Sequence, residues 1–348
     1  MANRRILIVG PSWVGDMVMA QSLFKVLRQQ DADCEIDVLA PQWSLPLLER
    51  MPEVRRGITM PLGHGELGLA RRWRLGRELR QQGYDQAIVL PNSLKSALVP
   101  WFAGIEQRTG WRGEMRYGLL NDLRVLDEDR HPLMVQRFVA LACAPDAVLP
   151  EPIPRPALAV DDASARALFE KKVSPEAGGK VLALCPGAEF GPAKRWPDRH
   201  YATLAARYLD RGWQVVLLGS AKDADVAERI RGALPPTVGS RCLNLCGKTS
   251  LGQAIDLLSR VTAVVSNDSG LMHIAAALRR PMAVVYGSTS PGFMPPLADR
   301  VAIEQIPVDC GPCFKRECPL GHLKCLVDLE PARVAASLDT LLAQTETH

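Results

Sequence analysis

Short apolar runs rich in β-branched residues alternate along the chain with longer amphipathic segments, and this alternation limits the fold more than any other feature. Strands are expected at the apolar runs Arg5–Val9, Glu35–Leu39, Gln86–Leu90, Val181–Cys185, Gln214–Leu218, Ala263–Ser266 and Met282–Tyr286. Helices are expected at Met17–Gln30, Leu69–Gln82, Asp198–Leu209, Asp223–Ala233, Leu251–Leu258, Leu271–Leu278 and Pro331–Ala343. This alternation is typical of parallel sheets, because each parallel strand pair needs a crossover segment. The sequence therefore predicts an α/β fold.

A proline-rich segment divides the pattern into two halves. The segment DAVLPEPIPRP, which ends at Pro156, holds too many prolines to sustain a helix or a central strand, so we expect an extended linker there. A length of 348 residues fits about two domains. We predict a first domain at 1–155, a second at 156–330 and a C-terminal helix at 331–348 that packs back on the first domain. The segment Ala97–Trp111 mixes turn residues with aromatics and is expected to form loop and short structure.

The charge balance and the absence of long apolar runs bear on partners and location. The chain carries 42 Lys+Arg and 38 Asp+Glu, a net charge of +4, which is too balanced for a dedicated nucleic-acid binder. We find no apolar run of the length that a membrane span or a secretory signal needs, so we expect a soluble, cytoplasmic protein with reduced cysteines. The segment Arg71–Arg80 contains five arginines. It is interpreted either as a contact to anionic lipid headgroups or as a solvated helix face.

The motif GPSWVGDMVM, Gly10–Met19, directly follows the first expected strand. Ser12 stands where a dinucleotide-binding fingerprint requires a second glycine, so an ordinary NAD site at this turn is not expected. Asp16 lies at the start of the following helix. Its carboxylate has two interpretations, a first-turn group that stabilises the helix terminus or a general base that faces a cleft.

Two loops of the second half carry charged residues beyond the ends of expected strands. Lys194 and Arg195 lie in CPGAEFGPAKRWPDRHY, where they either meet an anion or remain solvated cations. Asp223 and Asp225 lie in GSAKDADVAERI, where such a pair either holds a divalent metal or caps the start of a helix. We favour the capping role for this pair.

The motif SNDSGLMHIAAAL places a turn between a strand and a helix. The main-chain amides of Ser269, Gly270 and Leu271, together with the helix dipole, predict an anion site suited to a pyrophosphate. Asp268 is unsuited to binding an anion directly, but it can orient the turn or accept hydrogen bonds from sugar hydroxyls. His273 lies on the same helical face as Gly270 and is either a ligand contact or a structural histidine.

The C-terminal loop holds thiols at Cys310, Cys313, Cys318 and Cys325. The spacing C-x2-C-x4-C-x6-C is not that of a standard zinc ribbon, and a reducing compartment disfavours disulfides. We assign no metal here and expect reduced loop cysteines. A structural zinc or iron–sulfur site is the alternative.

Four motifs in order, GPSWVGDMVM, RTGWRGEMRYGLLND, PGAEFGPAKRWP and NDSGLMHIAAAL, resemble the bacterial lipopolysaccharide heptosyltransferases of glycosyltransferase family nine, over most of the chain through about Glu304. The resemblance implies a GT-B architecture, two Rossmann-like domains facing across a cleft. It implies inverting transfer of L-glycero-D-manno-heptose from ADP-heptose to the first heptose of the lipopolysaccharide inner core, with no cofactor. The alternatives are the family's enzyme that acts on Kdo2-lipid A, a sugar-nucleotide epimerase of similar two-domain fold, and a non-enzymatic nucleotide-binding module.

The resemblance also implies roles for individual residues. Asp16 falls on the family's catalytic aspartate, and Lys194 falls on the lysine that contacts the donor phosphate. The family's donor-sugar and diphosphate loop falls on Asp268, Ser269, Gly270 and His273, and its acidic residue at the nucleoside falls on Asp223. The acceptor is an anionic lipid, so Lys95, Arg112 and Arg116 on first-domain loops are its candidate contacts, with ordinary surface cations as the alternative. A peripheral contact with the inner membrane is expected from the same acceptor.

Overall fold

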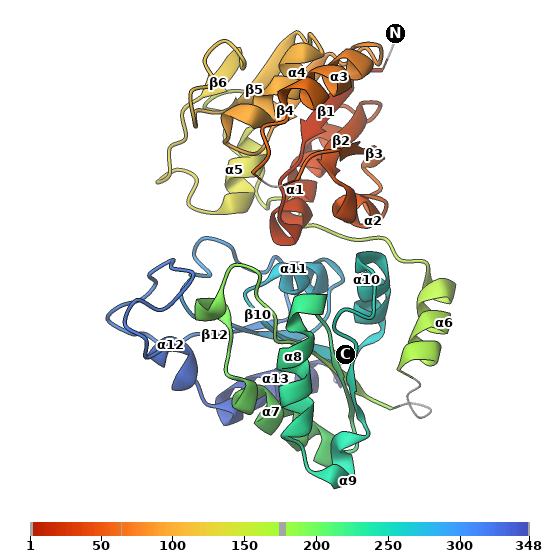
Figure 1. Cartoon of the computed structure of the whole chain (residues 1–348), viewed down its shortest axis with the longest axis vertical. Helices are drawn as coiled ribbons and strands as arrows, with labels where there is room; N and C mark the ends of the chain where they lie inside the picture. The colour runs from red at the N-terminus through yellow and green to blue at the C-terminus, as the bar shows by residue number, and fades with distance from the viewer. Residues whose placement is uncertain (1–2, 64, 174–178, 347–348) are drawn as a thin grey trace. The chain divides into compact units, whose positions relative to one another are not determined.

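The computed structural model describes residues 3–63, 65–173 and 179–346 (Figure 1). The chain forms two compact units, Met1–Ala159 and Val160–His348. In the described part of the chain, no helix combines the length and apolarity that a membrane span would need.

The first unit is built on one parallel six-stranded sheet in the order β3-β2-β1-β4-β5-β6. Its strands are β1 (Arg5–Val9), β2 (Glu35–Pro41), β3 (Val54–Met60), β4 (Gln86–Val89), β5 (Gln107–Trp111) and β6 (Asp122–Arg124). Its helices are α1 (Val14–Gln30), α2 (Leu45–Leu48), α3 (Leu69–Arg80), α4 (Leu98–Phe102) and α5 (Met134–Ala140). This strand order is that of a Rossmann domain.

The second unit repeats this architecture with the order β12-β11-β10-β7-β8-β9, again all parallel. Its strands are β7 (Val181–Cys185), β8 (Gln214–Leu217), β9 (Cys242–Asn244), β10 (Ala263–Asn267), β11 (Met282–Val285) and β12 (Val301–Glu304). Its helices are α6 (Asp162–Lys172), α7 (Asp198–Asp210), α8 (Ala224–Gly232), α9 (Pro236–Gly239), α10 (Leu251–Arg260), α11 (Gly270–Ala277), α12 (Lys324–Val327) and α13 (Pro331–Glu346). The predicted α/β fold with two parallel sheets is confirmed.

Four of the five strands that the apolar pattern did not predict are the edge strands β3, β6, β9 and β12. Most side chains of β3, β6 and β12 are only partly buried, so the apolar signal weakens there. The structure gives no such reason for β9, which is short and mostly buried. β5 lies inside Ala97–Trp111, which we expected to be loop and short structure. Its sequence QRTGW has no β-branched run, but Thr109, Gly110 and Trp111 are buried between neighbouring strands.

The boundary between the units lies at Ala159, a few residues beyond the predicted end of the first domain. The reason is a set of hydrogen bonds that hold the end of the proline-rich linker to the first unit. The Gln21 side chain donates to the Ala157 carbonyl at 2.8 Å and accepts from the Ala157 amide at 2.9 Å. The Ala159 amide donates to the carbonyl of Arg50 at 2.8 Å.

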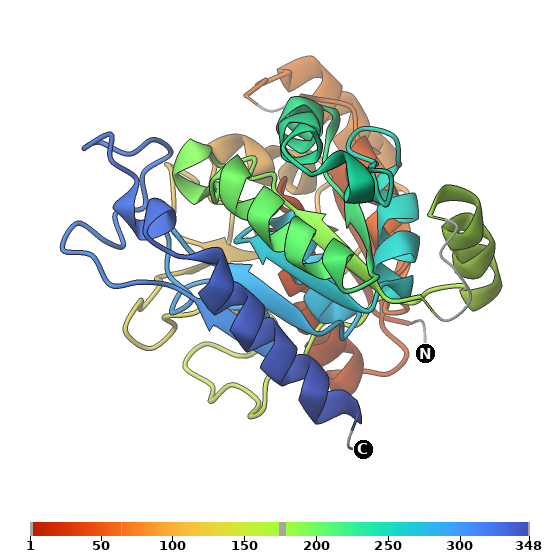
Figure 2. The same cartoon turned by 90° about the horizontal axis from the view of Figure 1, so that it is seen from below.

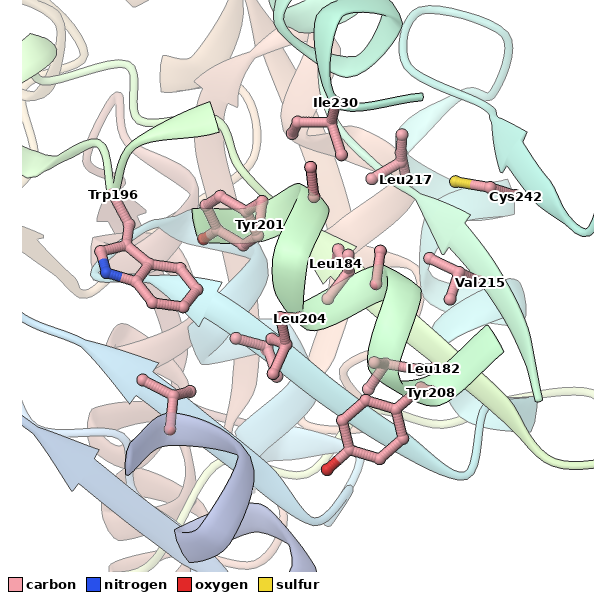
Figure 3. Packing of buried hydrophobic residues seen from close by; sticks show 14 of the residues in the cluster. Leu182, Leu184, Trp196, Tyr201, Leu204, Tyr208, Val215, Leu217, Ile230 and Cys242 are labelled. Carbon is pink, nitrogen blue, oxygen red and sulfur yellow. The ribbon is translucent and has the colours of Figure 1, made fainter. Parts of the chain in front are cut away.

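The apolar face of the C-terminal helix α13 is used within the second unit, whereas we expected it to serve the first domain. Val334, Ala335 and Leu338 join the core that α7 forms over the second sheet. Figure 2 shows α13, in dark blue, beside α7. In Figure 3, Tyr201 and Leu204 of α7 lie over the strand residues of that core. Asp339 of α13 accepts a hydrogen bond from Tyr208 at 3.0 Å, which fixes the helix beside α7.

Candidate active site

The charged residues of the second unit gather at the carboxyl edge of its sheet. The loop after β7 carries Lys194, and Asp268 directly follows β10. These two strands are neighbours at the point where the strand order reverses, the position at which open parallel sheets bind ligands.

A buried ion pair joins the two loops. The Lys194 ammonium donates to Oδ2 of Asp268 at 2.6 Å, and the Thr289 hydroxyl donates to the same oxygen at 2.6 Å. Lys194 is 9% exposed and Asp268 is 4% exposed. The ammonium also lies 5.0 Å from the centroid of the Phe190 ring. The lysine and aspartate, predicted separately as donor-site residues, thus form one charge-compensated unit.

Two residues that the sequence reasoning missed hold this unit in place. Thr289 lies just beyond β11, at the same sheet edge, and its position after a buried strand was the signal that could have identified it. Asn267 ends β10. Its amide group donates to the Pro186 carbonyl at 2.7 Å and accepts from the Trp196 amide at 3.0 Å, so it ties the Lys194 loop to the Asp268 turn.

The start of α11 provides the predicted anion-binding amides. Ser269 is the N-cap residue in extended conformation, and its side chain makes no capping hydrogen bond to the helix. Its hydroxyl instead lies 3.2 Å from that of Ser266. Asp268 is committed to Lys194 and Thr289, so the first amides of α11, at Gly270 and Leu271, are not neutralised by a side-chain cap. Such a terminus favours an anionic group.

His273 lies on α11 beneath this turn and is 3% exposed. Burial lowers the pKa of its imidazole to about 4, with the Asp268 carboxylate acting in the opposite direction and the Lys194 ammonium in the same direction. Its Nε2 atom makes no hydrogen bond to any other described residue. The ring is therefore neutral near physiological pH and adds no charge to the site.

Asp223 stands at the N-cap position of α8, as we favoured, but its side chain caps the short 3-10 turn Ala221–Asp223 before that helix and makes no capping hydrogen bond to α8. Its Oδ2 accepts from the amide and hydroxyl of Ser220 at 2.9 and 2.8 Å. The Arg195 guanidinium lies 3.8 Å from its other oxygen. Asp225 is exposed in the first turn of α8. Asp223 nevertheless crowds Gly187 of the β7 loop, where a Cβ atom would lie 2.5 Å from its Oδ2, so it borders the same sheet edge.

Asp16 occupies the equivalent edge of the first unit. It lies in the first turn of α1, which begins just beyond the end of β1, and its side chain is partly buried. Gly10 brings the end of β1 close to the helix, since a Cβ atom there would lie 2.6 Å from Cε of Met17. The first-turn position of the carboxylate is confirmed, and its role as a base stays a prediction.

The three candidate acceptor cations differ in accessibility. Arg112 is exposed, and Lys95 is half-buried in the turn Leu94–Ala97. Arg116 is fully buried, and its guanidinium donates to the carbonyls of Pro91, at 2.6 Å, and Trp111. Burial also lowers the pKa of this guanidinium. The structure therefore gives Arg116 a bracing role inside the first unit in place of the expected acceptor contact.

The arginine-rich segment forms α3 and divides in two by burial. Arg72 is 4% exposed and donates to the Leu67 carbonyl at 2.6 Å. The other arginines of this segment are exposed: Arg71, Arg74, Arg77 and Arg80. Trp73 lies among them at 52% exposure, with the Arg77 guanidinium carbon 5.7 Å from its ring centroid.

The comparisons with known proteins agree with this geometry. The model of glycosyltransferase family 9 (heptosyltransferase) matches residues 72–324. The chain belongs to this family. It is 52% identical to lipooligosaccharide heptosyltransferase 2 of Haemophilus influenzae, over 97% of this chain and 99% of that protein. It is 49% identical to lipopolysaccharide heptosyltransferase 2 of Escherichia coli, over 98% and 99%. The structure of E. coli ADP-heptose lps heptosyltransferase II superposes with a TM-score of 0.89 at 48% identity, over 98% of this chain and 99% of that one.

The buried His273 predicts a specific pH dependence of stability. In the unfolded chain His273 binds a proton below its ordinary pKa of 6.5, whereas in the folded chain it binds one only below about pH 4. The free energy of unfolding therefore falls by about 3 kcal/mol as the pH drops from 6.5 to about 4. We expect His273→Gln to remove this component, measured as denaturant-unfolding midpoints between neutral pH and about pH 4. Identical pH profiles for the variant and the wild type would contradict the burial of a neutral ring.

Proposed function

We propose that the protein is an inverting heptosyltransferase of the second type, which moves L-glycero-D-manno-heptose from ADP-heptose to the first heptose of the lipopolysaccharide inner core in a Gram-negative bacterium. The observation that carries this proposal is the Lys194–Asp268 pair beside the uncapped start of α11. The names of the full-length relatives support the sugar, the donor and the acceptor.

The second unit is the donor-binding domain in this proposal. The diphosphate of ADP-heptose accepts hydrogen bonds from the amides of Gly270 and Leu271, and the Lys194 ammonium turns from Asp268 toward it. These groups stabilise the negative charge that grows on the departing ADP, so no metal or other cofactor is required. Asp268 keeps its bond to Thr289 and accepts hydrogen bonds from heptose hydroxyls, while Asp223 serves the nucleoside end of the donor.

The first unit supplies the base. The Asp16 carboxylate takes the proton of the acceptor hydroxyl as that oxygen attacks the anomeric carbon from the face opposite ADP. Attack on that face inverts the anomeric configuration, and one carboxylate suffices because no covalent sugar intermediate forms. The N-terminus of α1 is a favourable position for the negative charge of Asp16, and Lys95 and Arg112 meet the anionic acceptor.

The choice of acceptor separates this proposal from its alternatives. We expect purified protein with ADP-heptose to glycosylate heptosyl-Kdo2-lipid A and to leave Kdo2-lipid A almost unchanged, with mass spectrometry as the readout. Preference for Kdo2-lipid A would indicate the family's other enzyme, which adds heptose to Kdo2-lipid A itself. Release of an altered sugar without acceptor would indicate an epimerase, and donor binding without turnover would indicate a binding module.

Removal of the base gives a direct kinetic prediction. Asp16→Asn keeps the size of the side chain but cannot take a proton, so we expect kcat to fall by about 10²–10⁴-fold while the affinity for ADP-heptose stays near that of the wild type. Initial rates and donor binding by calorimetry measure the two quantities. Asp31→Asn, at the other end of α1, is the matched control and should keep full activity. Near-normal turnover by Asp16→Asn would place the base elsewhere.

Removal of the donor-site ammonium gives a second kinetic prediction. Lys194→Met alone would leave the Asp268 charge buried and unpaired, so we combine it with Asp268→Asn to preserve packing. We expect the double variant to fold and to bind ADP about tenfold to a hundredfold more weakly, as loss of charged hydrogen bonds predicts. Lys222→Met removes an exposed lysine of the same unit and is the control. Unchanged ADP affinity and turnover in the double variant would exclude the assigned role.

We further propose that the protein works at the cytoplasmic face of the inner membrane, with α3 against the lipid. The exposed Arg71, Arg74, Arg77 and Arg80 suit anionic headgroups, and Trp73 suits the interface. We expect salt-sensitive binding to phosphatidylglycerol vesicles that is lost when these arginines become glutamine. Arg229→Gln with Arg231→Gln on α8 is the control. If the α3 variant and the α8 control variant bind vesicles equally well, α3 is a solvated helix that does not contact lipid.

A further inference from the structure

Four thiols of the second unit converge on one small cavity outside the proposed donor site. Cys310, Cys313, Cys318 and Cys325 all line it, together with apolar atoms of Leu320 and Leu323. Residues spread over a C-x2-C-x4-C-x6-C segment are thus folded back onto a common point.

The loop that carries these thiols has little regular structure. Residues 305–323 contain neither helix nor strand. Phe314 is 48% exposed and Leu320 is 61% exposed, whereas Leu323 packs against the core of the second unit. A metal ion bound by the thiols would add a cross-link within the loop.

The backbone of the loop turns sharply beside two of the cysteines. Phe314, next to Cys313, and Leu323, two residues before Cys325, adopt left-handed conformations with φ of 54° and 49°. The Gly321 amide donates to the Cys318 carbonyl at 3.1 Å, which closes a further turn. These turns bring the thiols to one cavity, as a single metal ion with four ligands requires.

We propose that Cys310, Cys313, Cys318 and Cys325 bind one thiolate-preferring divalent cation, Zn²⁺ or Fe²⁺, in a tetrahedral site. Four sulfur ligands suit either ion, and each thiol releases its proton to solvent when it binds. Among the described residues no group of ligands already stands in a coordinating arrangement, so the cation must draw the thiols inward across the cavity.

The site has a structural consequence for the donor loop, and this part rests on the proposed role of Lys194. The Arg316 carbonyl accepts from the Ala193 amide at 3.0 Å, and the Phe314 amide donates to the Ser288 carbonyl at 2.7 Å. The Arg316 guanidinium carbon lies 5.6 Å from the centroid of the Phe190 ring, which the Lys194 ammonium also approaches. A metal-closed cysteine loop therefore acts as a positioning element for Lys194.

Metal analysis of untagged protein, purified without chelators, tests the site itself. We expect about one equivalent of zinc or iron for each protein chain, and the analysis shows which of the two ions is bound. Removal of the ion with a strong chelator should make the loop thiols reactive toward an alkylating reagent. Cys313→Ser should lose the ion, whereas Cys143→Ser, outside the loop, should keep it.

If Cys313→Ser does not fold, the same question can be asked of the wild-type protein by removing and restoring the metal. Protein stripped of metal and then given Zn²⁺ alone should regain alkylation protection at Cys310, which is exposed to solvent. Metal-free protein whose loop thiols react equally with and without added Zn²⁺ or Fe²⁺ would overturn the proposal. If the metal binds but the ADP affinity is the same with and without it, only the proposed effect of the cysteine loop on Lys194 would be wrong.

Discussion

A buried ion pair between Lys194 and Asp268 is the interaction on which the proposed donor site depends. Removing both charges from water costs several kcal/mol for each ion, and the attraction between them offsets this only with good geometry and further hydrogen bonds. The 2.6 Å contact and the hydroxyl of Thr289 meet that condition. Apolar residues in place of a buried ion pair often give equal or greater stability, so stability is a weak reason for these charges. The proposed binding of the donor diphosphate by Lys194 gives them a function.

The strand order explains where the proposed site residues lie within each unit. Both units have the same strand order, and β1 and β7 occupy equivalent central positions in it. All strands of a sheet are parallel, so their carboxyl ends share one edge, and ligands bind at that edge. Asp16 comes just after β1 and the Lys194 loop just after β7, so each lies at this edge of its own sheet. In the proposed mechanism the first unit supplies the base and the second unit holds the leaving group.

The sequence predicted central strands, helices and loop positions well, because buried parallel strands and amphipathic helices have strong local patterns. It did not predict edge strands such as β3 or β12, because most of their side chains are only partly buried and give a weak apolar pattern. It placed Lys194 and Asp268 near the same ligand but did not predict their contact, which depends on long-range packing. Arg116 was misjudged for the same reason, since only the folded loop shows its guanidinium turned inward onto main-chain carbonyls.

In the proposed donor complex the diphosphate takes the Lys194 ammonium from Asp268. A crystal structure of the protein with ADP-heptose, or with a non-transferable analogue, would show this exchange of partners. We expect Lys194 Nζ within hydrogen-bond distance of a diphosphate oxygen, the Gly270 and Leu271 amides on the same group, and Asp268 still bonded to Thr289. A diphosphate bound elsewhere, with Lys194 still paired to Asp268, would rule out this mechanism of donor binding.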